Sequence, residues 1–169
     1  TIMLDSTPPV LERFEAAPEF SANRSFAFTL GASDVTSGVK EMRIDAGSGG
    51  QWTTFSATAT VSVSEGDGAK VILAYVKDAA GNVGPARELR VYLDTTPPQD
   101  VTIVLNNGAP VTSLRAVNVR LAAIDAVSGV DSYALRSNGT DWSAWIPFAA
   151  SGNFTLSEGD GLKVVFLKV

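Results

Sequence analysis

Residues 93–98 read LDTTPP and residues 4–9 read LDSTPP, so one short phrase occurs twice in a chain of 169 residues. Two further phrases return in the same order. ASDVTSGV begins at residue 32 and returns as AIDAVSGV at residue 123, while SEGDGAKV begins at residue 64 and returns as SEGDGLKV at residue 157. The spacings of 89, 91 and 93 residues drift only slightly, which indicates two copies of one structural unit with short loop insertions in the second.

The repeated proline phrase predicts the boundary between the two copies. Pro97 and Pro98 lack amide hydrogens and have fixed φ angles, so they cannot continue a helix or a central strand, and they form a stiff, extended joint. We therefore expect a first domain over residues 6–96 and a second over residues 97–169. Residues 1–4, TIML, align with RVYL at 90–93, so residues 1–5 are expected to be the tail of a preceding module.

Alternating apolar residues indicate β-strands in both copies, over 24–30 and 69–78 in the first and over 117–123 and 162–169 in the second. The faces expected to point inward comprise Phe26, Phe28, Leu30, Ile72, Ala74 and Val76 in the first copy, and Val117, Val119, Leu121, Val165, Leu167 and Val169 in the second. In the turn that follows residue 77, Asp78 suits the first position of a type I turn and Gly81 the left-handed position after it.

Further strands are expected over 38–44, 52–58, 60–64, 87–93, 101–107, 130–136, 142–148 and 153–157. Segment 10–20, VLERFEAAPEF, fits a strand or a short helix, and Pro18 together with the β-prone counterpart at 101–107 favours the strand. About seven short strands per copy, with a turn every 8 to 12 residues, predict an all-β fold of two tandem β-sandwiches.

The second copy is expected to lack its final strand. Val169 aligns with Val76, so nothing in the chain corresponds to 87–93 of the first copy. The chain is thus expected to be a window on a longer array. Two explanations stay open: truncation of a longer polypeptide, or a groove that accepts a strand from another chain, for which TIML is a possible donor. In both cases the second copy has an unpaired sheet edge that favours association.

Composition excludes several classes of function. The net charge is −5, whereas a nucleic-acid surface needs clustered Lys and Arg. No apolar run approaches the ~18 residues of a membrane span. The chain has no Cys and no His, so disulfides, thiol catalysis and the commonest general base are missing. One carboxylate pair, Glu158 and Asp160, could do acid–base work, but it recurs as Glu65 and Asp67, which suits a repeated turn. We expect no enzyme and no catalytic residue.

Calcium is the metal that the sequence leaves open. Asp side chains in loops are suitable hard ligands, and the candidates are the joint residues Asp5 and Asp94 with loop residues Asp34 and Asp125, or alternatively Asp67 and Asp160. The competing interpretation is that these carboxylates cap turns by accepting hydrogen bonds from nearby backbone amides. No stretch has the dense D-x-D-x-D spacing of a dedicated calcium loop, so capping is expected, with no metal or cofactor site.

Two tryptophans are the candidate ligand-binding residues. Trp142 and Trp145 lie an odd number of positions apart, so in a regular strand they face opposite sides of the sheet. One is therefore expected in the core. The other is expected to be partly exposed and able to stack on a sugar ring or a partner protein. The first copy has only Trp52 in this region.

The quoted motifs carry a resemblance to a known family. DTTPP at 94–98, DAVSGVDSYALRSNGTDWSAWIPFA at 125–149, LSEGDGLKVV at 156–165 and YVKDAAGNVG at 75–84 resemble the bacterial immunoglobulin-like repeats of large secreted and surface proteins. The resemblance covers essentially the whole chain. It implies an immunoglobulin-like or fibronectin-III-like sandwich in a tandem array, as in adhesins, cell-envelope proteins and spacers attached to enzymes.

Two functions follow as hypotheses. The first is a non-catalytic structural spacer of an extracellular or cell-surface bacterial protein, such as an adhesin, envelope or filament component. Its partners are expected to be neighbouring immunoglobulin-like modules of the same or another chain, including a possible strand donor. The alternative is a carbohydrate- or protein-binding module that uses the exposed aromatic residues of the second copy.

Overall fold

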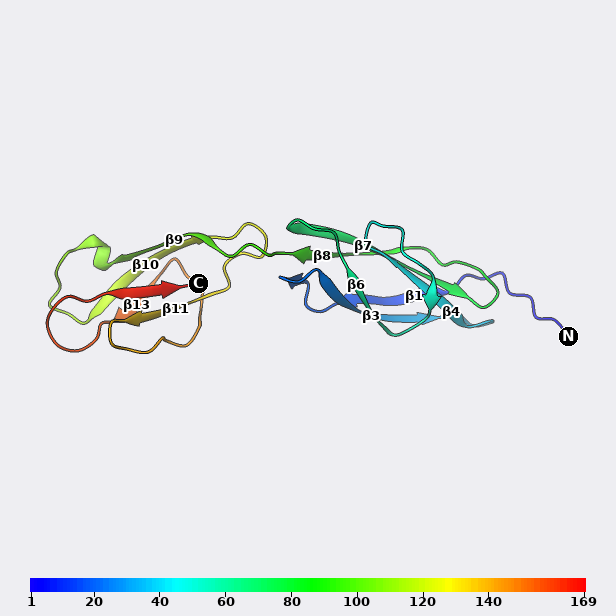
Figure 1. Ribbon diagram of the computed structural model, residues 1–169. Coiled ribbons are helices and arrows are strands. Elements are labelled where there is room, and N and C mark those ends of the chain that lie inside the picture. Colours follow the sequence, from blue (N-terminus) through cyan, green and yellow to red (C-terminus); the bar gives the residue numbers. More distant parts are fainter. The chain divides into compact units, whose positions relative to one another are not determined.

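The structure is a computed structural model that describes residues 1–169. It consists of β-strands, turns and one short 3₁₀ helix, η1 (Asn106–Gly108), as Figure 1 shows. None of its helical segments has the length and apolar character needed to cross a membrane. The chain divides into two compact units, unit 1 (Thr1–Thr95) and unit 2 (Thr96–Val169).

Unit 1 contains eight strands in two sheets. They are β1 (Val10–Ala16), β2 (Phe20–Ser21), β3 (Ser25–Ser33), β4 (Val39–Asp45), β5 (Thr53–Thr54), β6 (Thr58–Ser62), β7 (Gly68–Asp78) and β8 (Arg87–Leu93). One sheet has the order β1-β3-β6 and the other the order β2-β8-β7-β4-β5. Segment 10–20 therefore begins as a strand, as predicted. All neighbouring strands run antiparallel except β2 and β8, which pair in parallel.

The two sheets of unit 1 share one hydrophobic core. The predicted inward faces are confirmed: β3 buries Phe26, Phe28 and Leu30, and β7 buries Ile72, Ala74 and Val76. Phe28 stacks on Phe14 of β1, with ring centroids 5.3 Å apart. β8 adds Val91 and Leu93 to the same core and lies between β2 and β7 in the larger sheet.

Unit 2 contains six strands, also in two sheets. They are β9 (Gln99–Leu105), β10 (Ala116–Ile124), β11 (Ser132–Ser137), β12 (Ile146–Pro147), β13 (Ser151–Thr155) and β14 (Val165–Lys168). The sheets have the orders β13-β10-β9 and β12-β11-β14. The core is centred on Val119, Leu121, Tyr133 and Leu135, and Val117 is buried as predicted.

The repeat seen in the sequence is also present in the strand pairing. In sequence order, β9, β10, β11, β12, β13 and β14 of unit 2 correspond to β1, β3, β4, β5, β6 and β7 of unit 1. No strand of unit 2 corresponds to β2 or β8. As a result β14, the red strand in Figure 1, has β11 as its single neighbour, whereas β7 lies between β8 and β4.

Because β14 pairs with β11 alone, its inward-facing side chains are less buried than those of β7. Val165, Leu167 and Val169 face the core as predicted, but they are only partly buried, while their counterparts Ile72, Ala74 and Val76 are completely buried. The expected strands over 52–58 and 142–148 are also shorter than predicted, because regular pairing reaches only Thr53–Thr54 and Ile146–Pro147. Their tryptophans stack on cations of neighbouring strands instead of alternating across a sheet.

Candidate functional site

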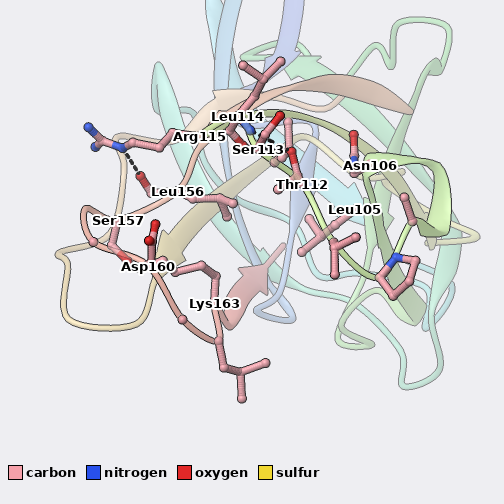
Figure 2. A pocket seen from close by; sticks show the side chains of 17 residues that line it. Leu105, Asn106, Thr112, Ser113, Leu114, Arg115, Leu156, Ser157, Asp160 and Lys163 are labelled. Atoms are coloured by element: carbon pink, nitrogen blue, oxygen red, sulfur yellow. Dashed lines mark hydrogen bonds between the residues drawn. The ribbon is translucent and has the colours of Figure 1, made fainter.

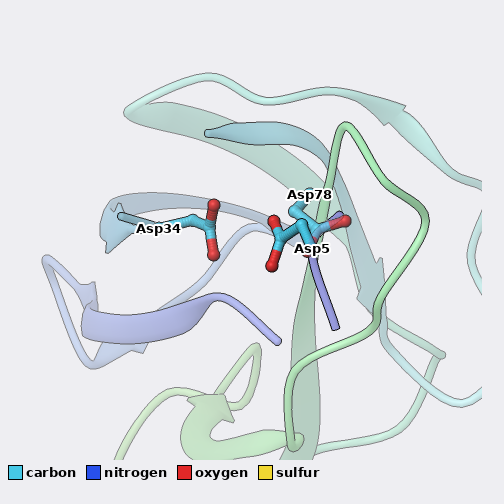
Figure 3. Close-up of side chains that lie close together, drawn as sticks. All are labelled: Asp5, Asp34 and Asp78. Carbon is cyan, nitrogen blue, oxygen red and sulfur yellow. The ribbon is translucent and has the colours of Figure 1, made fainter. Parts of the chain in front are cut away.

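Three carboxylates of unit 1 come together where three distant segments meet. Asp5 precedes β1, Asp34 follows β3 and Asp78 ends β7. Each offers an oxygen, and these oxygens all lie within 4.8 Å of one another. Figure 3 shows the carboxylate of Asp34 directed toward that of Asp5, with Asp78 beside Asp5. We call this group the acidic cluster.

Backbone amides hold two of the carboxylates in place. Asp34 Oδ1 accepts hydrogen bonds from the amides of Thr36, Ser37 and Gly38, at 3.2, 2.8 and 2.8 Å. Asp78 Oδ1 accepts from the amides of Gly81 and Asn82, at 2.7 and 2.8 Å. The predicted turn that begins at Asp78 is confirmed, with φ of 100° at Gly81.

Asn82 joins two members of the cluster. Its Nδ2 donates to Asp78 Oδ2 at 2.7 Å and to the backbone oxygen of Asp5 at 3.2 Å. Asp5 itself accepts the Thr7 amide at Oδ1, while its buried Oδ2 has no hydrogen-bond partner. The loop at 78–82 thus fixes Asp78 and also positions the segment that carries Asp5.

Asp78 is the most deeply buried acidic side chain of the cluster, with 1% of its surface exposed. Burial alone would raise the pKa of Asp78, but hydrogen bonds from the Asn82 side chain and from the amides of Asn82, Gly81 and Ala80 outweigh it and lower the pKa. Its contribution to stability is therefore present above the pKa of the unfolded state and is lost as the pH falls through the lowered folded-state pKa.

The capping interpretation of the loop aspartates is confirmed for Asp34 and for its counterpart in unit 2. Asp125 Oδ1 accepts the amides of Val127, Ser128 and Gly129 at 3.0 to 3.1 Å. Of the other calcium candidates, Asp67 accepts hydrogen bonds from Thr95 and Asp160 lines a hollow of unit 2. The prediction combined the joint residues Asp5 and Asp94 with the loop residues Asp34 and Asp125. Asp5 and Asp34 both lie in unit 1, whereas Asp94 lies in unit 1 and Asp125 in unit 2.

Sequence reasoning missed Asp78 as a member of the cluster, because it assigned this residue only to a turn. The signal was available in the period of β7. Ile72, Ala74 and Val76 face inward, and the next residue of the same parity is Asp78. A carboxylate at an inward position needs strong partners, which distinguishes it from an ordinary turn residue.

The tryptophan prediction is wrong in one respect, since neither Trp142 nor Trp145 belongs to the core. They are 36% and 54% exposed. Residues 138–145 do not form a regular strand, so the alternation on which the prediction depended does not apply. Lys168 Nζ lies 4.6 Å from the ring centroids of both tryptophans, and Arg136 lies 5.1 Å from that of Trp142. We call this the aromatic face of unit 2.

Unit 1 has a similar arrangement around Trp52. Arg43 lies between Trp52 and Tyr75, at 5.2 and 4.2 Å from the ring centroids, and Lys77 lies 4.5 Å from Trp52. Stacked cations of this kind contribute about 0.5–1 kcal/mol each at exposed positions. Because both units stack Lys and Arg on tryptophan, the stacking itself has a structural explanation, and only the greater exposure in unit 2 favours ligand binding.

Glu158, one of the two carboxylates considered for catalysis, is part of a repeated structural arrangement. Arg115 donates from Nε to the Leu156 carbonyl oxygen at 3.0 Å and pairs with Glu158 at 3.1 Å. Arg24 makes the corresponding contacts with the Val63 carbonyl oxygen and Glu65, both at 2.9 Å. Each arginine therefore ties the start of one strand to the loop that precedes another.

A hollow of ~320 Å³ opens in unit 2 between residues 105–117 and residues 156–163 (Figure 2). Leu105, Val117 and Leu156 supply apolar surface, and Asp160 and Lys163 supply polar groups. In unit 1, the C-terminal end of β8 occupies the corresponding position, because it pairs with Gly68–Lys70 on one side and with β2 on the other. The hollow therefore lies where unit 2 has no counterpart of β8.

Comparison with known proteins supports the fold. No family model and no curated protein matches the chain. Among solved structures, the fibronectin(III)-like modules of CbhA from Clostridium thermocellum have a TM-score of 0.50 at 15% identity, over 94% of this chain and 84% of that one. The chain has the fold of bacterial immunoglobulin-like modules. This finding confirms the resemblance predicted from the sequence at the level of structure.

Two further solved structures align with different shares of this chain. The PKD1 domain of the Vibrio cholerae metalloprotease PrtV has a TM-score of 0.41 at 25% identity and covers 53% of this chain and 100% of its own. Chitinase ChiA74 from Bacillus thuringiensis has a TM-score of 0.45 at 17% identity and covers 96% of this chain. The chain spans 30% of the length of that chitinase.

Proposed function

We propose that the chain is a pair of non-catalytic structural modules that act as a spacer in an extracellular or cell-surface bacterial protein. The observation that carries the proposal is the repetition of the same supporting contacts. Arg24–Glu65 recurs as Arg115–Glu158, and the Asp34 cap recurs as the Asp125 cap. Residues repeated in this way maintain strands and loops, and they do not converge on a reaction centre.

The location and the assembly follow from the resemblance. Modules of this kind are found in large secreted and surface proteins, so we place the parent protein outside the cell, as part of an adhesin, an envelope component or a filament. The two units occupy consecutive parts of the chain and have separate cores. Neighbouring modules of the same or another chain are the proposed partners.

A spacer that carries tension predicts independent mechanical unfolding of the two units. When the chain is stretched between its ends in a single-molecule experiment, we expect two separate force peaks. Unit 1, with 95 residues, should release up to roughly 31–34 nm and unit 2, with 74 residues, up to roughly 24–27 nm, since an extended residue spans about 3.3–3.6 Å. An unrelated immunoglobulin module, fused in tandem as an internal reference, calibrates the peaks. A smooth extension without peaks for either unit would contradict the spacer proposal.

The unpaired edge of β14 suggests how unit 2 joins its neighbours. We propose that a further strand pairs with β14 and fills the hollow beside Leu156, as β8 does beside β7 in unit 1. An open edge with apolar surface next to it favours such strand addition. Residues 1–4 remain a possible donor, because Ile2, Met3 and Leu4 are exposed and align with the end of β8.

A second candidate function is ligand binding on the aromatic face of unit 2, which the exposure of Trp142 and Trp145 favours. If it is correct, Trp145→Ala should abolish binding on a glycan array, because a stacked ring contributes much of the affinity for a sugar. The matched control is Trp52→Ala in unit 1. Binding that survives Trp142→Ala and Trp145→Ala, or that is equally reduced by Trp52→Ala, would exclude this face as the ligand site.

A further inference from the structure

We propose that the aromatic face of unit 2 binds an acidic polysaccharide, and that Arg136 and Lys168 hold the carboxylates of its uronic acid residues. The inference rests on the second candidate function, ligand binding at this face, and it names the chemical class of the ligand. It is independent of the spacer role, because a spacer module can carry a binding face or lack one.

Aromatic rings and cations alternate along this face in one continuous set of contacts. The guanidinium carbon of Arg136 lies 4.6 Å from the ring centroid of Phe166 and 5.1 Å from that of Trp142. Lys168 Nζ lies 4.6 Å from the centroids of both Trp142 and Trp145. All three rings are exposed. Unit 2 thus presents two positive charges, each in contact with two aromatic rings.

In unit 1 the corresponding cations are accompanied by two carboxylates. Lys77 lies opposite Glu41 in the pairing of β7 with β4, and the two side chains form a salt bridge. Asp45 follows Arg43 by two residues, so both point to the same side of the sheet. Backbone amides of its own loop are the main cause of the lowered pKa of Asp45, and the charge of Arg43 adds to the effect. The positive charge of this face is therefore balanced within unit 1.

Unit 2 keeps the two cations and lacks both carboxylates. Ala134 lies opposite Lys168 on the neighbouring strand, at the position where unit 1 has its glutamate. Asn138 follows Arg136 by two residues, at the position of the unit 1 aspartate. Neither cation forms a salt bridge. The exposed rings favour a ligand, and the uncompensated charge beside them favours an anionic one.

The two kinds of group together select the class of anion. A guanidinium binds a carboxylate through two parallel N–H donors, and an ammonium supplies a compact charge. An exposed aromatic ring offers an apolar surface on which a sugar ring can stack. A uronic acid combines a sugar ring with a carboxylate in one residue. Because Trp142 separates the two cations, the face suits a polymer that repeats its carboxylate from sugar to sugar better than a single small anion.

A nucleic acid also combines anionic groups with rings, but the charge of unit 2 does not suit one. Binding to phosphates depends on many contacts from Lys and Arg. Unit 2 has five Lys and Arg residues against six Asp and Glu residues. Asp141 is exposed next to Trp142 in the sequence and forms no salt bridge with either cation. The positive charge is thus confined to the aromatic face.

The test compares the binding of hexagalacturonate and of its methyl ester to the full chain by isothermal titration calorimetry in a buffer with EDTA. The two ligands have the same sugar rings, and only the acid is charged. We expect the acid to bind about tenfold more tightly or better, as for a hydrogen bond to a charged group. Its affinity should fall as the ionic strength rises, because salt screens exposed charges.

Variants of the two cations locate the carboxylates of the ligand. Lys168→Gln and Arg136→Gln should each weaken binding of the acid by about tenfold. Asn138→Asp, which adds a carboxylate beside Arg136 with little change in shape, should also weaken it. Lys77→Gln is the matched control, because it removes the equivalent cation of unit 1 and should leave the affinity unchanged. Hydrogen exchange at β3 and β10 verifies that each variant is folded before affinities are compared.

Tryptophan fluorescence supplies a second readout. In Trp52→Phe the remaining tryptophans are Trp142 and Trp145, so the acid should shift the emission. If the acid and its methyl ester bind equally and shift the emission equally, the face binds sugars but the acidic class is wrong. If neither binds, the acidic class is also overturned, and the glycan array decides separately whether the face binds neutral sugars. The proposal is equally overturned if Lys168→Gln and Arg136→Gln bind the acid like the wild type, or if a single-stranded hexanucleotide binds more tightly than the acid.

Discussion

Phe28→Ala should unfold unit 1 while unit 2 stays folded. Phe28 is 1% exposed, stacks on Phe14, and lies at the centre of the core that the two sheets of unit 1 share. Truncation of such a side chain to Ala costs about 3–5 kcal/mol, a large part of the total stability of a domain of this size. Urea unfolding followed by hydrogen exchange at β3 and β10 measures the two units separately.

Phe20→Ala is the control for this experiment, because it removes the same side chain from a surface position. Phe20 is exposed and stacks on Tyr92 at 4.7 Å between ring centroids. We expect a loss of roughly 0.5–1.5 kcal/mol, the contribution of an aromatic pair. If Phe28→Ala destabilised β10 as much as β3, the two units would not fold independently and the assignment of separate cores would be wrong.

A strand added after Val169 should stabilise unit 2 and reduce its self-association. The added segment is a copy of Lys77–Leu93, which in unit 1 continues from β7 through a turn into β8. β8 buries Val91 and Leu93, and burial of two such side chains contributes up to about 3–6 kcal/mol. Hydrogen exchange at β10 and β11 reports the stability of unit 2, and sedimentation velocity reports its association.

The control extension carries Asp in place of the counterparts of Val91 and Leu93. It has the same length and the same turn, but it cannot fill the hollow between residues 105–117 and 156–163. We expect this control to leave the edge of β14 unprotected and the chain prone to associate. Equal protection with both extensions, or none with either, would show that the hollow is not the position of a final strand.

The sequence was sufficient for the parts of the fold that depend on local periodicity. Alternation identified the buried faces of β3, β7 and β10, because a strand with one face in a core must place apolar residues at every second position. The ordered repeats predicted that strands of one unit would have counterparts in the other. β2 could not be foreseen, because its two residues are held by β8 and not by any pattern of their own.

The candidate sites were less predictable, because they depend on contacts between distant segments. Asp34 and Asp5 were singled out, but only the packing of three segments shows that Asp78 joins them and that one oxygen of Asp5 lacks a partner. Trp145 was expected to follow strand alternation, whereas its ring lies 4.6 Å from Lys168 Nζ, a group of another strand. The period of β7 marks Asp78 as an inward-facing carboxylate, but the pairings themselves arise from tertiary structure.

The position of β8 has a consequence for synthesis of the protein. Unit 1 cannot close its larger sheet until Leu93, the last residue of β8, has left the ribosome, because β8 pairs with both β7 and β2. At about 5–20 residues per second, translation of the 74 residues of unit 2 takes roughly 4–15 s. Unit 1 can therefore complete its sheets before unit 2 is fully made. Because β7 has already paired with β8 and β4 by the time unit 2 is complete, mispairing between two repeats of similar sequence is limited.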